Sequence, residues 1–309
     1  MSYKHKDLIG LRQASKDEIL YILERADEFK KLNLKSVKKA DYLRGKTVIN
    51  AFFEDSTRTR ISFEIAGKRL GADVINFSSS NSSIKKGETL IDTMQNIEAM
   101  RADIFVVRHV SVGAAKLIAN NTKASVVNAG DGAGEHPTQA LLDIYTIREE
   151  KGFLKGLKVS IIGDIEHSRV VRSNIFAMQK LGMEVTLFGP AMMMPLGVDV
   201  FGCKVAKNME DAVSGADVIM MLRVQLERQN GEVLFPSNRE YSKFFGLNKH
   251  RVTLANSPLI LHPGPINRGV EINSDVVESD CSLILDQVEN GVAIRMAVLS
   301  ILNENRGNL

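Results

Sequence analysis

Hydroxyl and guanidinium side chains are concentrated directly after the first predicted strand. The segment 54–60 reads EDSTRTR and passes from an apolar run into a helical pattern. A single serine or threonine here would be an ordinary N-cap. Three hydroxyls and two arginines add to the free N–H groups and the dipole of the helix, and together they favour a bound phosphate. The alternative is a well-capped helix with surface arginines.

Two other segments also resemble phosphate sites. The polar loop 78–88 suits a mobile lid, and Lys85 and Lys86 could bring positive charge to an anion, although most serine-rich loops are only loops. The residues Gly45-Lys46-Thr47 resemble the end of a P-loop. However, position 40 is alanine and a strand follows, so we exclude that motif.

A glycine-rich loop, 128–135, precedes His136 and Pro137. Proline suits the first position of a helix, so His136 should lie at a helix N-terminus. The helix dipole disfavours an imidazolium there, and we expect a neutral histidine that donates to a carbonyl oxygen. Gln139 follows on the same side, one turn into the helix. A purely structural histidine is the alternative.

The second half of the chain has three polar loops after apolar runs. Gly163-Asp164 leads to Arg169, and Arg223 and Gln225 lie on one side of an extended segment. The loop 262–265, HPGP, ends the last apolar run. Its prolines make it rigid and leave backbone carbonyls available to a ligand.

The motifs of metal and covalent chemistry are missing from the sequence. It contains no HExxH, no CxxC and no carboxylate cluster, so we expect neither a metal nor a cofactor. No Ser-His-Asp or Cys-His arrangement is indicated. Since cations converge without an acid–base pair, we expect electrostatic stabilisation to dominate catalysis.

Short apolar runs alternate with amphipathic segments along nearly the whole chain. The predicted strands are 46–53, 73–78, 103–108, 124–128, 158–163, 184–188, 203–206, 217–222 and 259–262. The predicted helices are 16–32, 58–70, 88–101, 136–150, 168–181, 237–247 and about 287–303. Ser15 with Glu18 predicts a capping box, and Gly71 should end the second helix.

This alternation predicts an α/β fold of two doubly wound domains, each a parallel sheet flanked by helices. We place the domains at 1–150 and 151–286, and we expect the C-terminal helix, about 287–309, to return to the first domain. Ligands of such sheets bind at the carboxyl ends of the strands, where the polar loops lie.

Composition narrows the class of protein. The 309 residues suit two domains, and a net charge of +3 gives no support to nucleic-acid binding. Two cysteines, Cys203 and Cys281, fit a reducing compartment. The charged N-terminus is unlike a signal peptide, and no 18-residue apolar stretch follows, so we expect a cytoplasmic protein without membrane contact.

In order along the chain, these motifs resemble the aspartate branch of the aspartate/ornithine carbamoyltransferase family. The matching segments are 56–60 (STRTR), 86–88 (KGE), 108–109 (RH), 136–139 (HPTQ), Arg169, 223–225 (RVQ) and 262–265 (HPGP). The reaction of this branch joins carbamoyl phosphate and L-aspartate to give N-carbamoyl-L-aspartate and phosphate, early in pyrimidine biosynthesis. The departing phosphate would accept the proton.

The resemblance also implies residue roles. Carbamoyl phosphate would be bound by Ser56, Thr57, Arg58, Thr59, Ser82, Lys86, Arg108, His136, Gln139, Gly264 and Pro265. Of these, Arg58, Thr59, Lys86, Arg108 and His136 would be catalytic. L-Aspartate would be bound by Lys86, Arg169, Arg223 and Gln225. Glu54 would act in domain closure, with Arg169 and Arg228 as partners.

Ser82 and Lys86 would come from a neighbouring subunit, which implies a homotrimer with shared active sites. The sequence does not decide whether the trimer binds a regulatory chain or a dihydroorotase. Ornithine carbamoyltransferase is the nearest alternative, but that branch has a cysteine in the loop occupied here by HPGP. A non-catalytic nucleotide- or anion-binding protein is the other alternative. The missing G-x-G-x-x-G, with Asp164 in the glycine loop, disfavours a dinucleotide.

Overall fold

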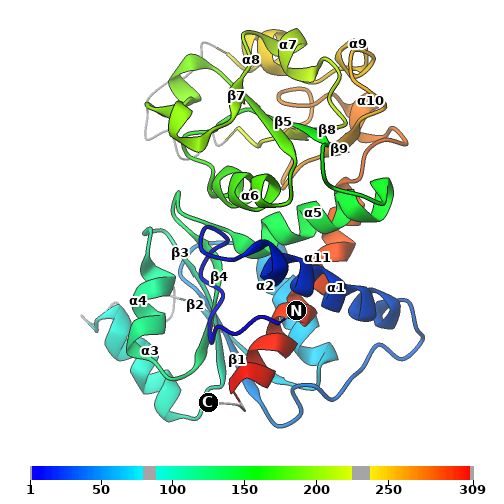
Figure 1. The fold of residues 1–309 in the computed structure, drawn as a ribbon. Coiled ribbons are helices and arrows are strands. Elements are labelled where there is room, and N and C mark those ends of the chain that lie inside the picture. Colours follow the sequence, from blue (N-terminus) through cyan, green and yellow to red (C-terminus); the bar gives the residue numbers. More distant parts are fainter. Residues whose placement is uncertain (1, 79–87, 225–236, 307–309) are drawn as a thin grey trace. The chain divides into compact units, whose positions relative to one another are not determined.

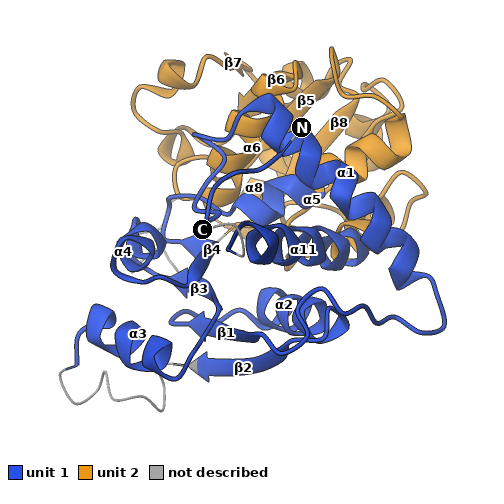
Figure 2. Cartoon of the chain, turned by 60° about the horizontal axis from the view of Figure 1, so that its bottom comes forward, with its two compact units in different colours: residues 1–142, 289–309 blue, residues 143–288 orange. Residues whose placement is uncertain are grey.

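The computed structural model describes residues 2–78, 88–224 and 237–306 (Figure 1). The chain forms two compact units, coloured separately in Figure 2. The first unit contains residues 1–142 and 289–309, and the second contains residues 143–288.

The first unit is built on a four-stranded parallel sheet in the order β2-β1-β3-β4. Its strands are β1 (Thr47–Phe52), β2 (Asp73–Ser78), β3 (Ile104–His109) and β4 (Ser125–Asp131). Its helices are α1 (Lys16–Asn33), α2 (Thr57–Arg69), α3 (Leu90–Ala99), α4 (Ala114–Asn121) and the first turns of α5 (Pro137–Lys151). Every residue of β4 is buried, as expected for a strand in a parallel sheet that helices cover.

Helix ends in this unit follow the local sequence. Ser15 and Glu18 form the predicted capping box, and α5 begins at Pro137 as predicted. Gly71 follows the end of α2 with φ +86°, a conformation that only glycine adopts without strain.

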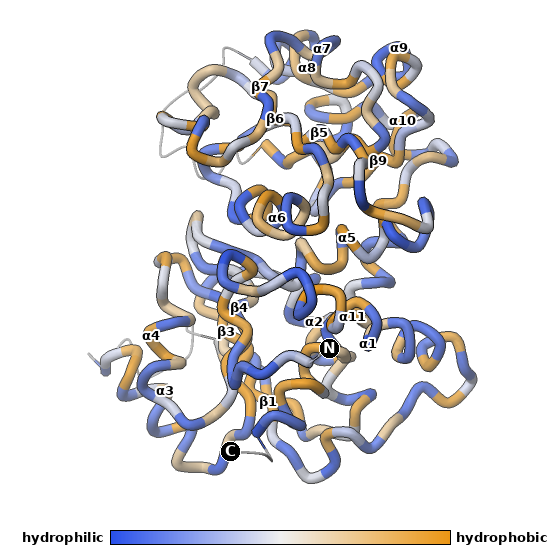
Figure 3. Tube along the Cα trace, viewed as in Figure 1, coloured by the Kyte–Doolittle hydropathy of each residue, from blue (hydrophilic) through white to orange (hydrophobic). Residues whose placement is uncertain are grey.

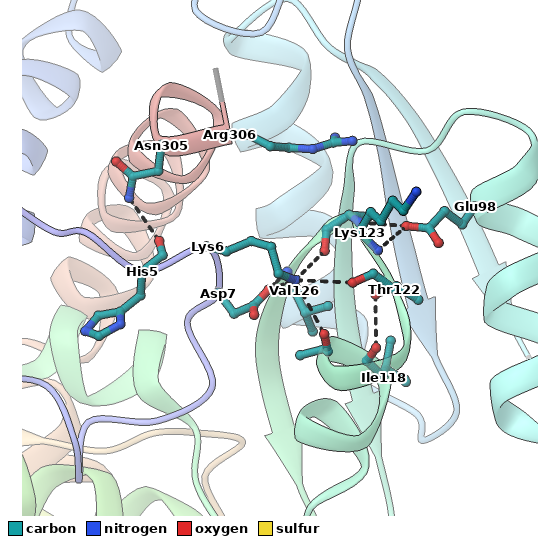
Figure 4. A network of polar contacts seen from close by, with 12 residues as sticks. His5, Lys6, Asp7, Glu98, Ile118, Thr122, Lys123, Val126, Asn305 and Arg306 are labelled. Carbon is teal, nitrogen blue, oxygen red and sulfur yellow. Dashed lines mark hydrogen bonds and ion pairs between the residues drawn. The ribbon is translucent and has the colours of Figure 1, made fainter. Parts of the chain in front are cut away.

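The N-terminal segment is bound to the edge of the sheet (Figure 4). Leu8 forms a parallel bridge with Val127 of β4. The Lys6 ammonium group lies 2.8 Å from Asp7 Oδ1 and donates to the carbonyl of Ala124 at 2.9 Å. These contacts connect the first residues of the chain to the segment between α4 and β4.

The second unit contains a five-stranded parallel sheet in the order β7-β6-β5-β8-β9. Its strands are β5 (Lys158–Ile162), β6 (Glu184–Phe188), β7 (Lys204–Val205), β8 (Val218–Met221) and β9 (Leu259–Leu261). Its helices are α6 (Arg169–Lys180), α7 (Met209–Val213), α8 (Asn238–Phe245), α9 (Lys249–Val252) and α10 (Ser274–Val277), with 3-10 turns at Ala191–Met193 and Val198–Phe201. The central strands of both sheets are largely apolar in the hydropathy colouring of Figure 3.

The C-terminal helix α11 (Ile284–Arg306) returns to the first unit, as predicted. Lys30 of α1 donates to Asn290 Oδ1 at 2.7 Å, and Arg295 donates to Ser62 Oγ of α2 at 2.8 Å. Arg295 also lies over the ring of Phe63, 5.1 Å from its centroid.

The predicted α/β class with two parallel sheets is confirmed. The predictions missed α4, α7, α9 and α10, which are four to eight residues long and too short to show a helical period. Among the described helices, none has the length and apolar character needed to cross a bilayer.

Candidate active site

Both sheets reverse their strand order beside the predicted site residues. In the first sheet the chain passes from β1 to β2 on one side and then to β3 on the other. The crevice between the carboxyl ends of β1 and β3 is therefore a topological switch point, where sheets of this kind bind ligands. In the second sheet the same reversal lies between β5 and β8.

The N-terminus of α2 follows β1 at the first switch point. Ser56 is the N-cap residue, but its side chain makes no capping hydrogen bond. Thr57 and Arg58 are exposed, whereas Thr59 is buried within the first turn. The helix therefore presents hydroxyl groups and a guanidinium beside its first N–H groups, an arrangement that suits a phosphate.

Arg108 lies on the other side of this switch point, opposite Phe52 in the strand register. Its guanidinium is 3.0 Å from Glu54 Oε1 and donates to the Ala129 carbonyl at 3.3 Å. The two side chains of the ion pair are only 12% and 15% exposed, so the orientation of Arg108 is restrained. Glu54, assigned from the resemblance to domain closure, thus holds Arg108 within its own unit.

Burial and a backbone hydrogen bond favour the neutral form of His109, which is next to Arg108. Burial lowers the pKa of His109, and this effect exceeds the opposing charges of Glu54 and Asp131. The backbone N–H of Ser111 donates to His109 Nδ1 at 2.9 Å, so that nitrogen carries no proton. We therefore assign the positive charge at the end of β3 to Arg108 alone.

His136 directly precedes the first residue of α5, as predicted, and its side chain is buried, with 4% exposed. Its carbonyl accepts from the N–H of Gln139 at 3.0 Å, and Gln139 is also buried. Glu135 attaches the loop that precedes His136 to the N-terminal segment, because the Glu135 carboxylate accepts from the N–H of Leu11 at 2.7 Å. Sequence reasoning did not identify Glu135, although it directly precedes His136.

Two arginines of the second unit flank its switch point. Arg169 is the first residue of α6, which follows β5, and it is 6% exposed. Arg223 follows β8. Ser168 caps α6, since its hydroxyl accepts from the N–H of Val171 at 3.4 Å. Ser82, Lys86, Gln225 and Arg228 lie outside the described residues.

The loop 262–265 follows β9 and contains a cis peptide bond between Gly264 and Pro265. The N–H of His262 donates to Gln287 Oε1 at 2.9 Å, and Gln287 donates to Asp143 Oδ1 at 2.7 Å. Asp143 also accepts from Asn174 of α6 at 2.8 Å and is fully buried. Sequence reasoning missed this network, whose only signal was a charged residue within the apolar part of α5.

Metal-ligand geometry is not found in the described part of the chain, where no three His, Cys, Asp or Glu side chains are grouped. The described residues assigned to the substrates are arginines, hydroxyl-bearing residues, a buried histidine, a buried glutamine and backbone groups. Such a set binds anions and polarises a carbonyl.

Comparison with known proteins identifies the family. The model of the aspartate/ornithine carbamoyltransferase carbamoyl-P binding domain matches residues 6–149, and that of the Asp/Orn binding domain matches residues 155–302. The chain belongs to the aspartate/ornithine carbamoyltransferase family, whose members are carbamoyltransferases.

Among curated relatives, the chain is 66% identical to the aspartate carbamoyltransferase catalytic subunit of Campylobacter concisus, over 99% of this chain and 100% of the relative. It is 54% identical to that of Geobacter sulfurreducens, over 97% and 96% of the two chains.

Solved structures of both branches share the fold. Aspartate transcarbamoylase from Trypanosoma cruzi, in complex with N-(phosphonacetyl)-L-aspartic acid, superposes with a TM-score of 0.86 at 30% identity, covering 96% of this chain and 95% of that one. Ornithine carbamoyltransferase from Pyrococcus furiosus has the same TM-score at 31% identity, covering 97% and 98%.

Proposed function

We propose that this chain transfers the carbamoyl group of carbamoyl phosphate to the amine of L-aspartate, giving N-carbamoyl-L-aspartate and phosphate. The observation that carries this proposal is the 66% identity over essentially the full length to a curated aspartate carbamoyltransferase catalytic subunit. The fold alone does not favour one acceptor, because structures of both branches match equally well.

The first unit supplies the carbamoyl phosphate site of this proposal. The phosphate binds to the N-terminus of α2 through Ser56, Thr57, Arg58 and Thr59, and Arg108 adds a second guanidinium. Two observations support this assignment. The side chain of the N-cap residue Ser56 makes no capping hydrogen bond, and the ion pair with Glu54 restrains Arg108. Helix N–H groups and arginines are the usual ligands of such an anion.

His136, Thr59 and Arg108 polarise the carbamoyl carbonyl. As the aspartate amine attacks, negative charge develops on that oxygen, and donors already in place stabilise it at little reorganisation cost. The phosphate leaves and accepts the proton of the amine. Gln139 and the carbonyls of Gly264 and Pro265 hold the carbamoyl amino group.

The second unit supplies the aspartate site. Arg169 and Arg223 bind the two carboxylates of the substrate, with Gln225 as a further ligand. Their positions after β5 and β8, the strands beside the switch point, support this assignment. Guanidinium groups pair with carboxylates in two-pronged hydrogen bonds, which suits a dicarboxylic substrate better than a diamino acid.

We further propose that the enzyme is a cytoplasmic homotrimer in which Ser82 and Lys86 complete the site of a neighbouring subunit, and that it acts early in pyrimidine biosynthesis. The relatives are named catalytic subunits, which supports a regulatory chain as a possible partner.

The products formed by the purified chain alone test this proposal. The chain is supplied with carbamoyl phosphate and either L-aspartate or L-ornithine. We expect carbamoyl-aspartate and no citrulline.

Replacing Arg223 with Ala should raise the aspartate KM at least about tenfold, because a substrate carboxylate is left without its partner. Replacing the exposed Arg239 on α8 serves as the matched control. Citrulline formation would overturn the assignment of Arg223.

A further inference from the structure

We propose that Glu271 is a positioning residue that fixes two substrate loops of the second unit, 262–265 and Arg223–Val224, in one arrangement. It acts through His262 and Asn267, and none of these three residues needs to touch a substrate. This proposal rests on the proposed function, since it concerns the loops assigned there to the carbamoyl amino group and to aspartate.

Glu271 is the centre of a buried network. Its Oε1 lies 3.2 Å from His262 Nε2, and the side chains of both residues are 0% exposed. The same oxygen accepts from the backbone N–H of Asn267 at 2.6 Å. Hydrogen bonds to a charged group in a low-dielectric interior are strong and restrict geometry.

The network determines the tautomer of His262. The backbone N–H of Gly264 donates to His262 Nδ1 at 2.8 Å, so Nδ1 carries no proton. The ring proton is therefore on Nε2, from where it is donated to Glu271. As a result, the imidazole connects the Glu271 carboxylate to Gly264, whose carbonyl is assigned to the substrate.

Asn267 extends the network to the aspartate loop. Its side-chain amide donates to the carbonyl of Val224 at 3.0 Å, and Val224 is fully buried directly after Arg223. The backbone of Glu271 is fixed as well, because its carbonyl accepts from the N–H of Leu247 at 2.9 Å. One carboxylate thus restrains loops that are about forty residues apart in the sequence.

Only one oxygen of Glu271 makes these bonds. Oε2 is buried and has no hydrogen-bond partner among the described residues. A glutamine with its Oε1 in the same place could accept both bonds without the charge, whereas a leucine could accept neither. The proposal therefore predicts that Glu271→Gln preserves the function that Glu271→Leu removes.

Steady-state kinetics of the full-length variants test this difference. We expect Glu271→Leu to lower kcat and to raise the aspartate KM, each by about tenfold or more, because displacement of positioning groups by about 1 Å has effects of this size. Glu271→Gln should stay within about threefold of the parent chain. Binding of inorganic phosphate, which the first unit provides, should not change in either variant. Wild-type kinetics in Glu271→Leu, or equal defects in both variants, would overturn the proposal.

Asn267→Asp is a second test that leaves Glu271 in place. The substitution keeps the size of the side chain and removes the donor to Val224. We expect the aspartate KM to rise about tenfold while phosphate binding is retained, because only the loop that carries Arg223 is released. An unchanged aspartate KM would contradict the link between the two loops.

The tautomer gives a measurement that does not depend on activity. In a chain with ¹⁵N-labelled histidine, the ring nitrogens of His262, assigned with the His262→Asn variant, should show a single Nε2–H form. Glu271→Leu should produce a mixture of tautomers, and Glu271→Gln should not. An Nδ1–H form in the parent chain would overturn the proposed network. Failure of the parent chain to carbamoylate either amine would reject the proposed function and leave this measurement intact.

Discussion

His136 combines burial, a helix N-terminus and a glycine-rich loop, and each of these bears on its chemistry. We expect a neutral imidazole at that position, which could donate one hydrogen bond to an oxygen that gains negative charge. Arg108 has the complementary role in the proposed mechanism, and its ion pair with Glu54 restrains a permanent positive charge at the end of β3.

Replacing His136 with Ala should lower kcat by about 10² to about 10³ with a smaller change in the carbamoyl phosphate KM, because the lost donor acts mainly on charge in the transition state. Initial rates measured over a range of both substrates check this expectation. The exposed His250 provides the control, since His250→Ala should retain full activity. A loss confined to KM would assign His136 to ground-state binding.

Replacing Glu54 with Gln should raise the aspartate KM more than the carbamoyl phosphate KM, if Glu54 acts in domain closure as the resemblance implies. The structure adds a competing expectation, because Glu54 also holds Arg108. An equal rise in both constants would show that the ion pair with Arg108 is its main role. Initial-rate kinetics with each substrate varied in turn separate these outcomes.

Cys203 should react slowly with iodoacetamide at neutral pH. Burial raises the pKa of its thiol to about 11, so only a fraction of about 10⁻³ of the side chain is in the reactive thiolate form at pH 8. The alkylation rate should increase about tenfold per pH unit between about pH 8 and about pH 10. Mass spectrometry of the Cys203 peptide measures this rate, and the urea-unfolded chain should react much faster at the same pH.

At the scale of elements, helix boundaries depend on a few residues with special backbone conformations. Gly71 ends α2 at φ +86°, and a Cβ at this position would lie 3.2 Å from the carbonyl oxygen of Ala40. Gly152 follows α5 at φ +75°, and a Cβ there would meet no atom within 4 Å. Comparing alanine variants of Gly71 and Gly152 therefore separates the cost of backbone strain from the cost of a steric contact.

Gly152→Ala should destabilise the protein by about 1 kcal/mol through the left-handed backbone alone, and Gly71→Ala should cost about 2 kcal/mol because its neighbour must also move. Thermal melting monitored by circular dichroism compares the two variants at equal concentration. Equal losses in the two variants would show that the contact with Ala40 relaxes freely, and a larger loss for Gly152→Ala would contradict the prediction.

At the scale of the whole molecule, the first unit is discontinuous in sequence. Its last part begins at Glu289 and contains all but the first turn of α11. The buried residues of this part include Asn290, Ala293, Ile294, Arg295, Met296, Ala297, Val298, Leu299, Ile301 and Leu302. Contacts with Lys30 and Ser62 attach this helix to α1 and α2. We propose that residues 289–309 complete the domain that binds carbamoyl phosphate.

A chain truncated after Val288 should lose this domain, because the apolar surface under α11 would be exposed to water. We expect aggregation on expression or strong binding of a hydrophobic dye. Truncation after Arg306 is the control and should leave solubility and melting unchanged. A soluble chain ending at Val288 with normal phosphate binding would reject a structural role for α11 in this domain.

Strand positions could be read from the sequence because the buried strands are apolar runs, and helices such as α6 could be read because their apolar residues recur with a helical period. Short helices such as α9 could not, since four residues show no period. The site loops were also identifiable, because Ser56, His136 and Arg169 stand at the ends of predicted strands or the starts of predicted helices. Their position after strands in parallel sheets predicts that Ser56 and His136 lie at the carboxyl edge of the first sheet and Arg169 at that of the second.

Only the tertiary structure decided which polar groups support these loops. Asp143 and Gln287 are 144 residues apart in sequence and form a 2.7 Å hydrogen bond. The bond of Glu271 to His262 likewise depends on side chains that face each other in a buried space. The sequence by itself determined the long elements and the family resemblance, and it named the residues that are proposed to bind the substrates, because those depend on local pattern and order. The supporting contacts depend on packing in three dimensions, which no local pattern encodes.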